Sequence, residues 1–317
     1  MLTIRPIAAD ELSAFLALQA DPERAADQAA YLDRMFAAGA MRPEWCYVAT
    51  DGDDTVGRFA FWSLPTLDVP ISLVLVDVVR HIDGTLARAA IADALLQRAV
   101  EDALAGSPEE FGYVLDEPEQ SPQWQDDPGE RASWLERARF NVVRSTSRWS
   151  YDGPPPRMRS RLTFRTYEAV GEAAFLSALE EVSSSTLDAR VNADRDRLGA
   201  AAEARSALED VRALEVQPGW WQLAYDASDA LVGLVMPARA PNMTTIGYIG
   251  VVPSQRGRGY VDDLLARGTA ILRYDLPDIV IRADTDLANA PMAAAFERAG
   301  YEWFATRREY ELSTLSR

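Results

Sequence analysis

The sequence predicts a mixed α/β protein built from two similar domains in tandem. Its 317 residues are enough for about two domains of ordinary size. Several segments of the first half recur, in the same order, in the second half. A short proline-rich stretch lies between the two halves and fits neither a helix nor a central strand.

The repeat fixes the order of elements that we expect. Its first segment reads LTIRP in one copy and LTFRT in the other, each followed by a helical Ala/Leu/Glu pattern. The second reads strand, acidic turn, strand, which is typical of a hairpin. The third reads helix, turn, strand. Each half is therefore expected to run β-α-(α)-β-β-β-α-β-α-β. The paired segments are residues 2–6 with 162–166, 45–62 with 220–236, and 134–144 with 294–305.

The domain boundaries follow from the linker. Asp152 to Pro156 reads DGPPP, so we expect a first domain at 1–152, a linker at 153–160 and a second domain at 161–317. Residues 183–215 are rich in Ala, Arg and Asp and helical in pattern. Both a substrate lid and simple packing fit that segment.

Composition excludes several classes of function. All 32 positive charges are arginine, and 49 acidic residues give a net charge of −17. Such a surface disfavours nucleic acid and anionic membranes and favours cationic substrates such as amines. The longest apolar stretch, residues 69–79, is too short to span a membrane, and no signal peptide is visible, so we expect a cytoplasmic protein. With Cys46 and His81 alone, we expect no disulfide and no metal site.

The most informative stretch joins a strand at 244–252 to a helix expected from Val261 to Leu272. Between them lie Arg256, Gly257, Arg258, Gly259 and Tyr260. Glycines let successive backbone N–H groups converge, the helix N-terminus adds partial positive charge, and arginines suit phosphate oxygens. This predicts an anion site. The dinucleotide and nucleotide-triphosphate patterns GxGxxG and GxxxxGK[ST] do not occur in this turn.

Residues 250–262, GVVPSQRGRGYVD, resemble the acyl-coenzyme A pyrophosphate loop of the GNAT superfamily of N-acyltransferases. Downstream, Asn289 and the run from Phe296 to Tyr301 are similar to the family's asparagine and aromatic-x-x-x-Gly-aromatic patterns. The duplication resembles its tandem, mycothiol synthase-like architecture. Two positions depart from the family pattern: Val261 stands where Gly or Ala is usual, and Phe296 stands where a catalytic tyrosine is frequent.

The resemblance implies two GNAT-like domains, with acetyl-CoA bound by the second as co-substrate. It also implies that the backbone N–H of Val251 or Val252 stabilises negative charge on the reacting carbonyl oxygen. The residues implied in binding acetyl-CoA are Val251, Val252, Arg256, Gly257, Arg258, Gly259, Tyr260, Val261, Asn289 and Phe296.

Three side chains are candidates for moving protons. Tyr248, on the strand before the turn, is either a core aromatic or a hydroxyl in the cleft. Asp284 and Asp286 follow a strand expected at Asp278 to Ala283, where ligands gather at the edge of α/β sheets. Alternatively, Asp286 and Asn289 cap the helix that begins near Ala290.

The first half lacks the features of the turn. The segment from Asp83 to Leu86 stands opposite the glycine–arginine turn; it lacks both arginines, begins with an acid and keeps only one of the two glycines. We therefore expect the first domain to bind acyl-CoA poorly and to serve a structural or substrate-shaping role. His81, in the same segment, is expected to be exposed and idle.

These observations favour an N-acetyltransferase acting on the primary amine of a small molecule. The second half contains no cysteine, so direct attack in a ternary complex is the simpler mechanism. A non-catalytic acyl-CoA-binding or regulatory module is the alternative, and a scaffold for protein association is a third hypothesis. The acceptor amine, the acyl-chain preference and the oligomeric state are left open.

Overall fold

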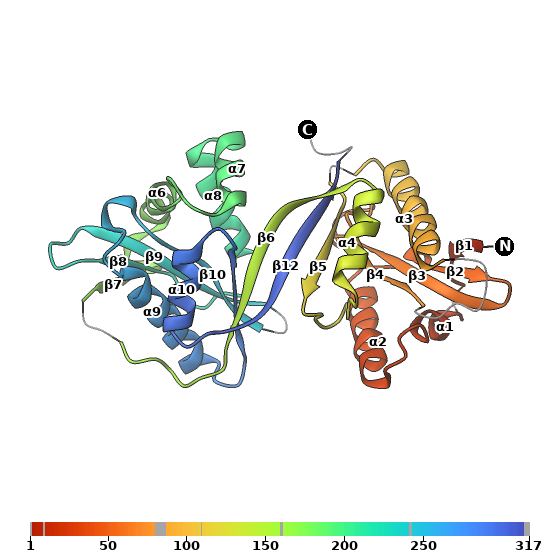
Figure 1. The fold of residues 1–317 in the computed structure, drawn as a ribbon. Coiled ribbons are helices and arrows are strands. Elements are labelled where there is room, and N and C mark those ends of the chain that lie inside the picture. The colour runs from red at the N-terminus through yellow and green to blue at the C-terminus, as the bar shows by residue number, and fades with distance from the viewer. Residues whose placement is uncertain are drawn as a thin grey trace. The chain divides into compact units, whose positions relative to one another are not determined.

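A computed structural model describes residues 2–8, 10–79, 87–108, 110–158, 161–240 and 243–313. The chain forms two compact units, each with helices packed on a mixed sheet (Figure 1). Unit 1 comprises Met1–Ser145 and Ala305–Arg317, and unit 2 comprises Thr146–Phe304. The expected mixed α/β class is confirmed. Within the described residues, no helix is long and apolar enough to cross a membrane.

The first repeat contains six strands and four α-helices in its described part. They are β1 (Leu2–Pro6), α1 (Leu12–Leu16), α2 (Pro22–Ala37), β2 (Cys46–Asp51), β3 (Asp54–Trp62), β4 (Ser72–Val78), α3 (Arg88–Ala105), β5 (Gly112–Glu117), α4 (Pro128–Arg137) and β6 (Phe140–Tyr151), with a 3-10 turn, η1, at Pro43–Trp45.

The second repeat has the same order of strands, with more helices after its first strand. Its described elements are β7 (Thr163–Thr166), α5 (Tyr167–Val170), α6 (Glu172–Val182), α7 (Ala189–Leu198), α8 (Ala200–Arg212), β8 (Gln222–Tyr225), β9 (Leu231–Ala240), β10 (Met243–Val251), η2 (Pro253–Gln255), α9 (Tyr260–Asp275), β11 (Ile281–Asp286), α10 (Ala290–Arg298) and β12 (Glu302–Leu312).

Both expected hairpins are present, because β2 pairs with β3 and β8 with β9 in antiparallel fashion. Left-handed residues close both turns, Gly52 at φ 63° and Asp229 at φ 64°. Trp220 and Trp221 precede β8 and are buried in the core of unit 2. Cys46 is buried at the start of β2 and forms no disulfide.

The final strand of each repeat completes the sheet of the other unit. Residues 146–151 of β6 pair with β11 in unit 2, and residues 306–311 of β12 pair with β5 in unit 1. Trp149 of β6 accordingly lies in the core of unit 2, and Tyr310 of β12 lies in the core of unit 1. The compact units therefore differ from the predicted domains, 1–152 and 161–317. The reason is that the last strand of each repeat pairs with a strand of the other unit.

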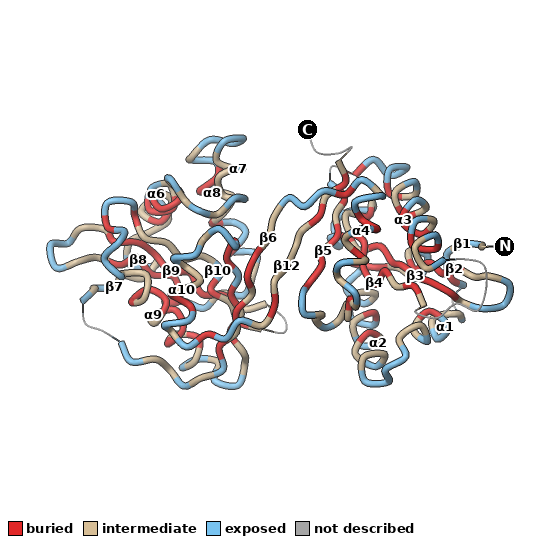
Figure 2. Tube along the Cα trace, in the orientation of Figure 1, coloured by how far each residue is buried: buried red, intermediate tan, exposed pale blue. Residues whose placement is uncertain are grey.

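In unit 2 the sheet order is β6-β11-β10-β9-β8-β7, and only β10 and β11 are parallel among its described pairs. Helices α6 and α8 pack on one face and α9 packs on the other (Figure 1). Glycines allow this close packing, since a Cβ at Gly247 would lie 2.9 Å from Val211 of α8, and one at Gly268 of α9 would lie 2.7 Å from Val235. Figure 2 shows that burial is concentrated on the strands and on the helix faces that cover them.

Candidate active site

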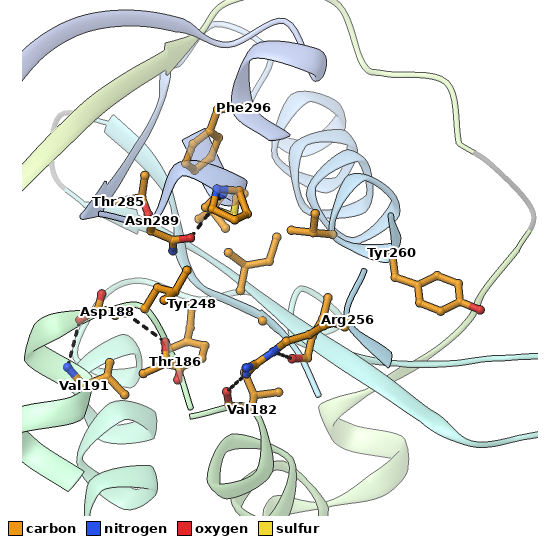
Figure 3. A pocket seen from close by; sticks show the side chains of 18 of the residues that line it. Val182, Thr186, Asp188, Val191, Tyr248, Arg256, Tyr260, Thr285, Asn289 and Phe296 are labelled. Carbon is orange, nitrogen blue, oxygen red and sulfur yellow. Dashed lines mark hydrogen bonds between the residues drawn. The ribbon is translucent and has the colours of Figure 1, made fainter. Parts of the chain in front are cut away.

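Unit 2 contains a cavity of about 470 Å³ at the end of β10. Its walls come from β10, the turn into α9, the end of β11, the start of α10 and the loop before α7 (Figure 3). Most of the predicted site residues line it: Tyr248, Val251, Arg256, Gly257, Gly259, Tyr260, Val261, Asp284, Asn289 and Phe296. The lining does not include Val252, Arg258 or Asp286.

The cavity opens where two parallel strands separate. Within the described residues, β10 and β11 pair only at Thr244 with Ile281 and at Thr245 with Arg282. Just beyond, a register shift between Ile246 and Tyr248 marks a bulge in β10 against β9. A bulge of this kind bends a strand and ends regular pairing, so the strands diverge and leave room for a ligand.

The two predicted backbone donors are not equivalent. The N–H of Val252 donates to the carbonyl of Val232 at 2.9 Å, so it is already used within the sheet. Successive N–H groups of a strand point to opposite sides. The N–H of Val251 therefore points away from β9, toward the opening between β10 and β11. This removes Val252 as a donor to a ligand and favours Val251.

The turn into α9 is a backbone anion cradle. Gly257 and Gly259 take left-handed conformations, with φ of 76° and 72°, that only glycine adopts without strain. Gly259 is the N-cap of α9, and no side chain caps this helix. Among the described residues, the N–H groups of 257–261 donate to no protein acceptor. The unpaired N–H groups at the start of a helix favour an anion here.

Arg256 holds the cavity wall together, which the sequence did not indicate. Its Nε donates to the carbonyl of Val251 at 3.0 Å, and its two terminal nitrogens donate to the carbonyls of Val182, Ser184 and Ser185 at 2.8 to 3.1 Å. Figure 3 shows this side chain reaching Val182. The expected role of Arg256 as a phosphate ligand is therefore replaced by a structural one, since its donors are satisfied by backbone oxygens.

Arg258 is the arginine of the turn that is available to a ligand. It is exposed, and within the described chain its guanidinium makes no hydrogen bond or ion pair. It is close enough to Asp226 to help lower the pKa of that carboxyl, after the hydrogen bonds from Ser228 and Ala230. The side chain lies outside the cavity lining, on the turn that forms the anion cradle.

Arg161, the first residue after the predicted linker, supports the turn from outside. Arg161 donates to the carbonyls of Arg258 at 3.3 Å and Gly259 at 3.1 Å. It also pairs with the buried carboxylate of Asp263 in the first turn of α9. Its guanidinium lies over the ring of Tyr260, which points away from the cavity in Figure 3. Sequence reasoning missed Arg161, because nothing local links it to the turn.

Tyr248 faces the cavity, and its ring is partly exposed. Burial raises the pKa of its hydroxyl, and the negative charges of Glu203 and Asp188 raise it further. The hydroxyl is therefore protonated at neutral pH. Within the described residues it makes no hydrogen bond, so it is available as a donor. Of the two predicted alternatives, the structure favours a hydroxyl in the cleft.

The two predicted aspartates, Asp284 and Asp286, lie in different surroundings. Strand β11 runs from Ile281 to Asp286, three residues later than predicted, so both lie inside it. Asp284 lines the cavity, and its Oδ1 lies 3.5 Å from the Nε of Arg148 in β6. Asp286 is buried, and its Oδ2 accepts the N–H of Ala189 at 2.5 Å. Asp286 thus accepts the N–H of the first residue of α7, whose N-cap is Asp188, and it does not line the cavity as the sequence suggested.

The start of α10 supplies two further walls. Asn289 is the N-cap, and its Oδ1 accepts the N–H of Met292 at 3.4 Å while the residue also lines the cavity. Phe296 is almost fully buried and stacks on Trp149 of β6, with centroids 5.7 Å apart. It forms an apolar surface and has no proton to offer.

The loop before α7 forms the opposite wall. This loop lies in residues 183–215, for which the sequence left open a substrate lid and simple packing. The structure places part of the segment in the lining and part, α8, in the core. The lining residues on this side, which sequence reasoning did not single out, are Val182 at the end of α6, Ser185, Thr186, Leu187 and Asp188 in the loop, and Val191 in α7.

In unit 1 the corresponding gap between parallel strands is filled by the protein itself. β4 and β5 pair at Ser72 with Gly112 and at Leu73 with Tyr113. Beyond these pairs, the side chain of Gln123 accepts the N–H of Leu75 at 2.7 Å.

Two more side chains complete this filling. Gln125 accepts the N–H of Asp116 at 3.1 Å and donates to the carbonyl of Val114 at 2.5 Å. Arg131 donates to the carbonyl of Val76 and, at 2.8 Å, to the carboxylate of Asp77. The segment 83–86 and His81 lie outside the described residues.

Solved structures share this fold over nearly the whole chain. A GCN5-related N-acetyltransferase from Sphaerobacter thermophilus has a TM-score of 0.58 at 17% identity, covering 98% of this chain and 95% of that one. A tandem GNAT protein from the clavulanic acid biosynthesis pathway has a TM-score of 0.51 at 17% identity, covering 98% of each chain. No protein-family profile and no curated protein matches the sequence. The chain therefore has the tandem GNAT fold.

Proposed function

We propose that unit 2 binds acetyl-CoA and transfers its acetyl group to the primary amine of a small molecule. The observation that carries the proposal is the pairing of an unused backbone anion cradle, residues 257–261, with a cavity at the point where β10 and β11 separate. The tandem GNAT fold supports it.

The residues present fit acetyl-CoA. The N–H groups of the turn and the guanidinium of Arg258 suit a pyrophosphate, because both offer positive or partially positive donors. Phe296, Val251 and Met292 offer apolar and backbone surface to the acyl-bearing arm. The N–H of Val261, which stands in place of a smaller residue, belongs to the first turn of α9, where no side chain caps the helix. No group of described residues is suited to hold a metal ion.

The chain's own groups suit acyl transfer to an amine. The thioester supplies the reactive carbonyl, and the N–H of Val251 is placed to stabilise negative charge on that oxygen. Tyr248 offers a protonated hydroxyl to the departing sulfur. Asp188 and Asp284 give the lining negative charge, which favours a cationic acceptor. The only cysteine, Cys46, is buried in unit 1, so direct attack is the simplest route.

The second candidate is an acyl-CoA-binding or regulatory module without turnover. Two observations favour it: Phe296 has no hydroxyl, and Asp286 lies outside the cavity lining, where it accepts the N–H of Ala189. Both candidates predict binding of acetyl-CoA. Only the enzyme releases CoA thiol faster when an amine is added. Both also fit a cytoplasmic protein without nucleic-acid or membrane partners, given its net charge of −17.

The test is thiol release from acetyl-CoA with a panel of primary amines that includes amino sugars, polyamines, amino acids and peptide N-termini. The enzyme proposal expects at least one amine to raise the rate well above hydrolysis, with an acetylated product of the expected mass. Tight binding of acetyl-CoA with no acceleration by any amine would favour the module instead.

A further inference from the structure

The end of α6 packs on β10 directly beside the backbone donor of the cavity. Val182, the last residue of α6, is 4% exposed and lines the cavity. A Cβ placed on Gly250 would collide with Cγ1 of Val182, so the valine occupies the space that a side chain at position 250 would need. Gly250 immediately precedes Val251, whose N–H points toward the opening between β10 and β11. Val182 therefore forms the wall next to that N–H.

This wall is held by the guanidinium of Arg256. It donates to the carbonyl of Val182 at 2.8 Å and to the carbonyl of Val251 at 3.0 Å. Figure 3 shows the first of these hydrogen bonds. Because one planar, rigid group holds both carbonyls, Val182 cannot move away from Val251 without breaking hydrogen bonds of Arg256.

The other side of the cavity is formed by α10. Phe296 and Met292 line it there, and Figure 3 shows Phe296 and Val182 on opposite sides of the cavity. A thioester whose oxygen accepts the N–H of Val251 has its carbonyl carbon about 4 Å from that nitrogen. The acyl chain begins at that carbon. A ligand arm that lies along α10 therefore presents its acyl chain to Val182.

We propose that Val182 sets the length of the acyl group that the cavity accepts and limits it to a short group such as acetyl. The inference rests on the proposed function, which places the thioester at Val251. A longer chain has to displace Val182 from Gly250 or Arg256 from its carbonyls. A single methylene in an apolar pocket changes discrimination between substrates by about 10- to 200-fold.

The test measures discrimination among acetyl-CoA, butyryl-CoA and hexanoyl-CoA by the intact chain. The measurements are kcat/KM with the best amine of the panel and affinity by calorimetry, with free CoA as the baseline. We expect the wild type to favour acetyl-CoA over butyryl-CoA by about tenfold or more in both measurements. Val182→Ala removes two methyl groups from the wall, and it should reduce this preference by about tenfold or more.

Val211→Ala is the matched control. Val211 of α8 is also a buried valine that packs on a glycine of β10, since a Cβ at Gly247 would lie 2.9 Å from it, but it does not line the cavity. This variant also loses two buried methyl groups, and it should keep the wild-type preference for acetyl-CoA. The preference compares substrates on one protein, so a partly unfolded variant still reports it.

The outcomes separate the inference from the proposed function. An unchanged preference in Val182→Ala, or the same relaxation in Val211→Ala, would overturn the inference alone. A wild type that binds hexanoyl-CoA as tightly as acetyl-CoA does the same. If the wild type binds acetyl-CoA but acetylates no amine, the proposed transfer fails, and the affinities still decide the role of Val182. Binding of none of the three acyl-CoA compounds overturns both.

Discussion

At the scale of residues, the two arginines of the turn have different functions although they lie two positions apart. The guanidinium of Arg256 donates hydrogen bonds to carbonyls of the cavity wall. Arg258, by contrast, is exposed and makes no hydrogen bond or ion pair within the described residues. The first is needed for the shape of the site. The second is the side chain that a phosphate would meet.

Substitution separates these roles. We expect Arg258→Ala to weaken acetyl-CoA binding about tenfold or more, the loss of a charge-assisted hydrogen bond, with an unchanged melting temperature. Arg256→Ala should lower the melting temperature, because it leaves carbonyls at the end of α6 without their donor. Calorimetry and thermal unfolding measure the two effects. Unchanged affinity in Arg258→Ala would contradict the assignment of the cradle.

The sequence identified the residues whose conformation is locally encoded. Gly257 and Gly259 were predicted because an anion cradle needs left-handed backbone, and both adopt it. The roles of Arg256 and Asp286 were not predictable. Arg256 reaches carbonyls about seventy positions earlier, and Asp286 accepts the N–H of Ala189, 97 positions earlier.

At the scale of elements, the residue that follows the predicted linker takes part in the site. Arg161 connects the carbonyls of Arg258 and Gly259 to the buried Asp263, and so it fixes the start of α9. With those carbonyls held on the outside, the N–H groups of the turn are free for a ligand.

We therefore expect Arg161→Ala to raise the KM for acetyl-CoA severalfold and to leave kcat nearly unchanged, because it loosens the cradle and touches no reacting group. The matched control is Arg165→Ala, which removes an exposed arginine paired with Asp229 near the β8–β9 turn. Steady-state kinetics with varied acetyl-CoA would decide this. A fall in kcat at constant KM would show that Arg161 acts elsewhere.

The exchange of final strands sets which fragments can fold. Residues 161–317 lack the part of β6 that pairs with β11, together with Trp149 under Phe296. Residues 146–304 keep both. We expect the fragment 146–304 to unfold cooperatively and the fragment 161–317 to be unstable or aggregated, as measured by circular dichroism and thermal unfolding. Equal cooperativity of the two fragments would mean that β6 is dispensable.

The sequence predicted the order of elements but not this exchange. The repeat is visible because each copy preserves its local patterns of hairpins, helices and turns. Which sheet a final strand joins depends on pairing between residues more than a hundred positions apart, such as Asp284 with Arg148. No local pattern encodes that choice.

At the scale of the whole molecule, the two units have similar sheets but differ in what occupies the gap between their parallel strands. In unit 2 the gap between β10 and β11 opens into the cavity. In unit 1 the corresponding gap holds Gln123, Gln125 and Arg131, which satisfy the backbone groups that a ligand would otherwise meet. Although burial raises the pKa of the partly buried Asp77, Arg58 and Arg131 together hold it below its ordinary value.

The measurement that tests this account most directly is the stoichiometry of acetyl-CoA binding to the intact chain by calorimetry. The account predicts one site per chain, lost in a variant with a disrupted cradle such as Gly259→Val. Two sites per chain would mean that unit 1 releases its own side chains to admit a ligand. No binding at all would contradict the assignment of the cradle, the cavity and the proposed reaction together.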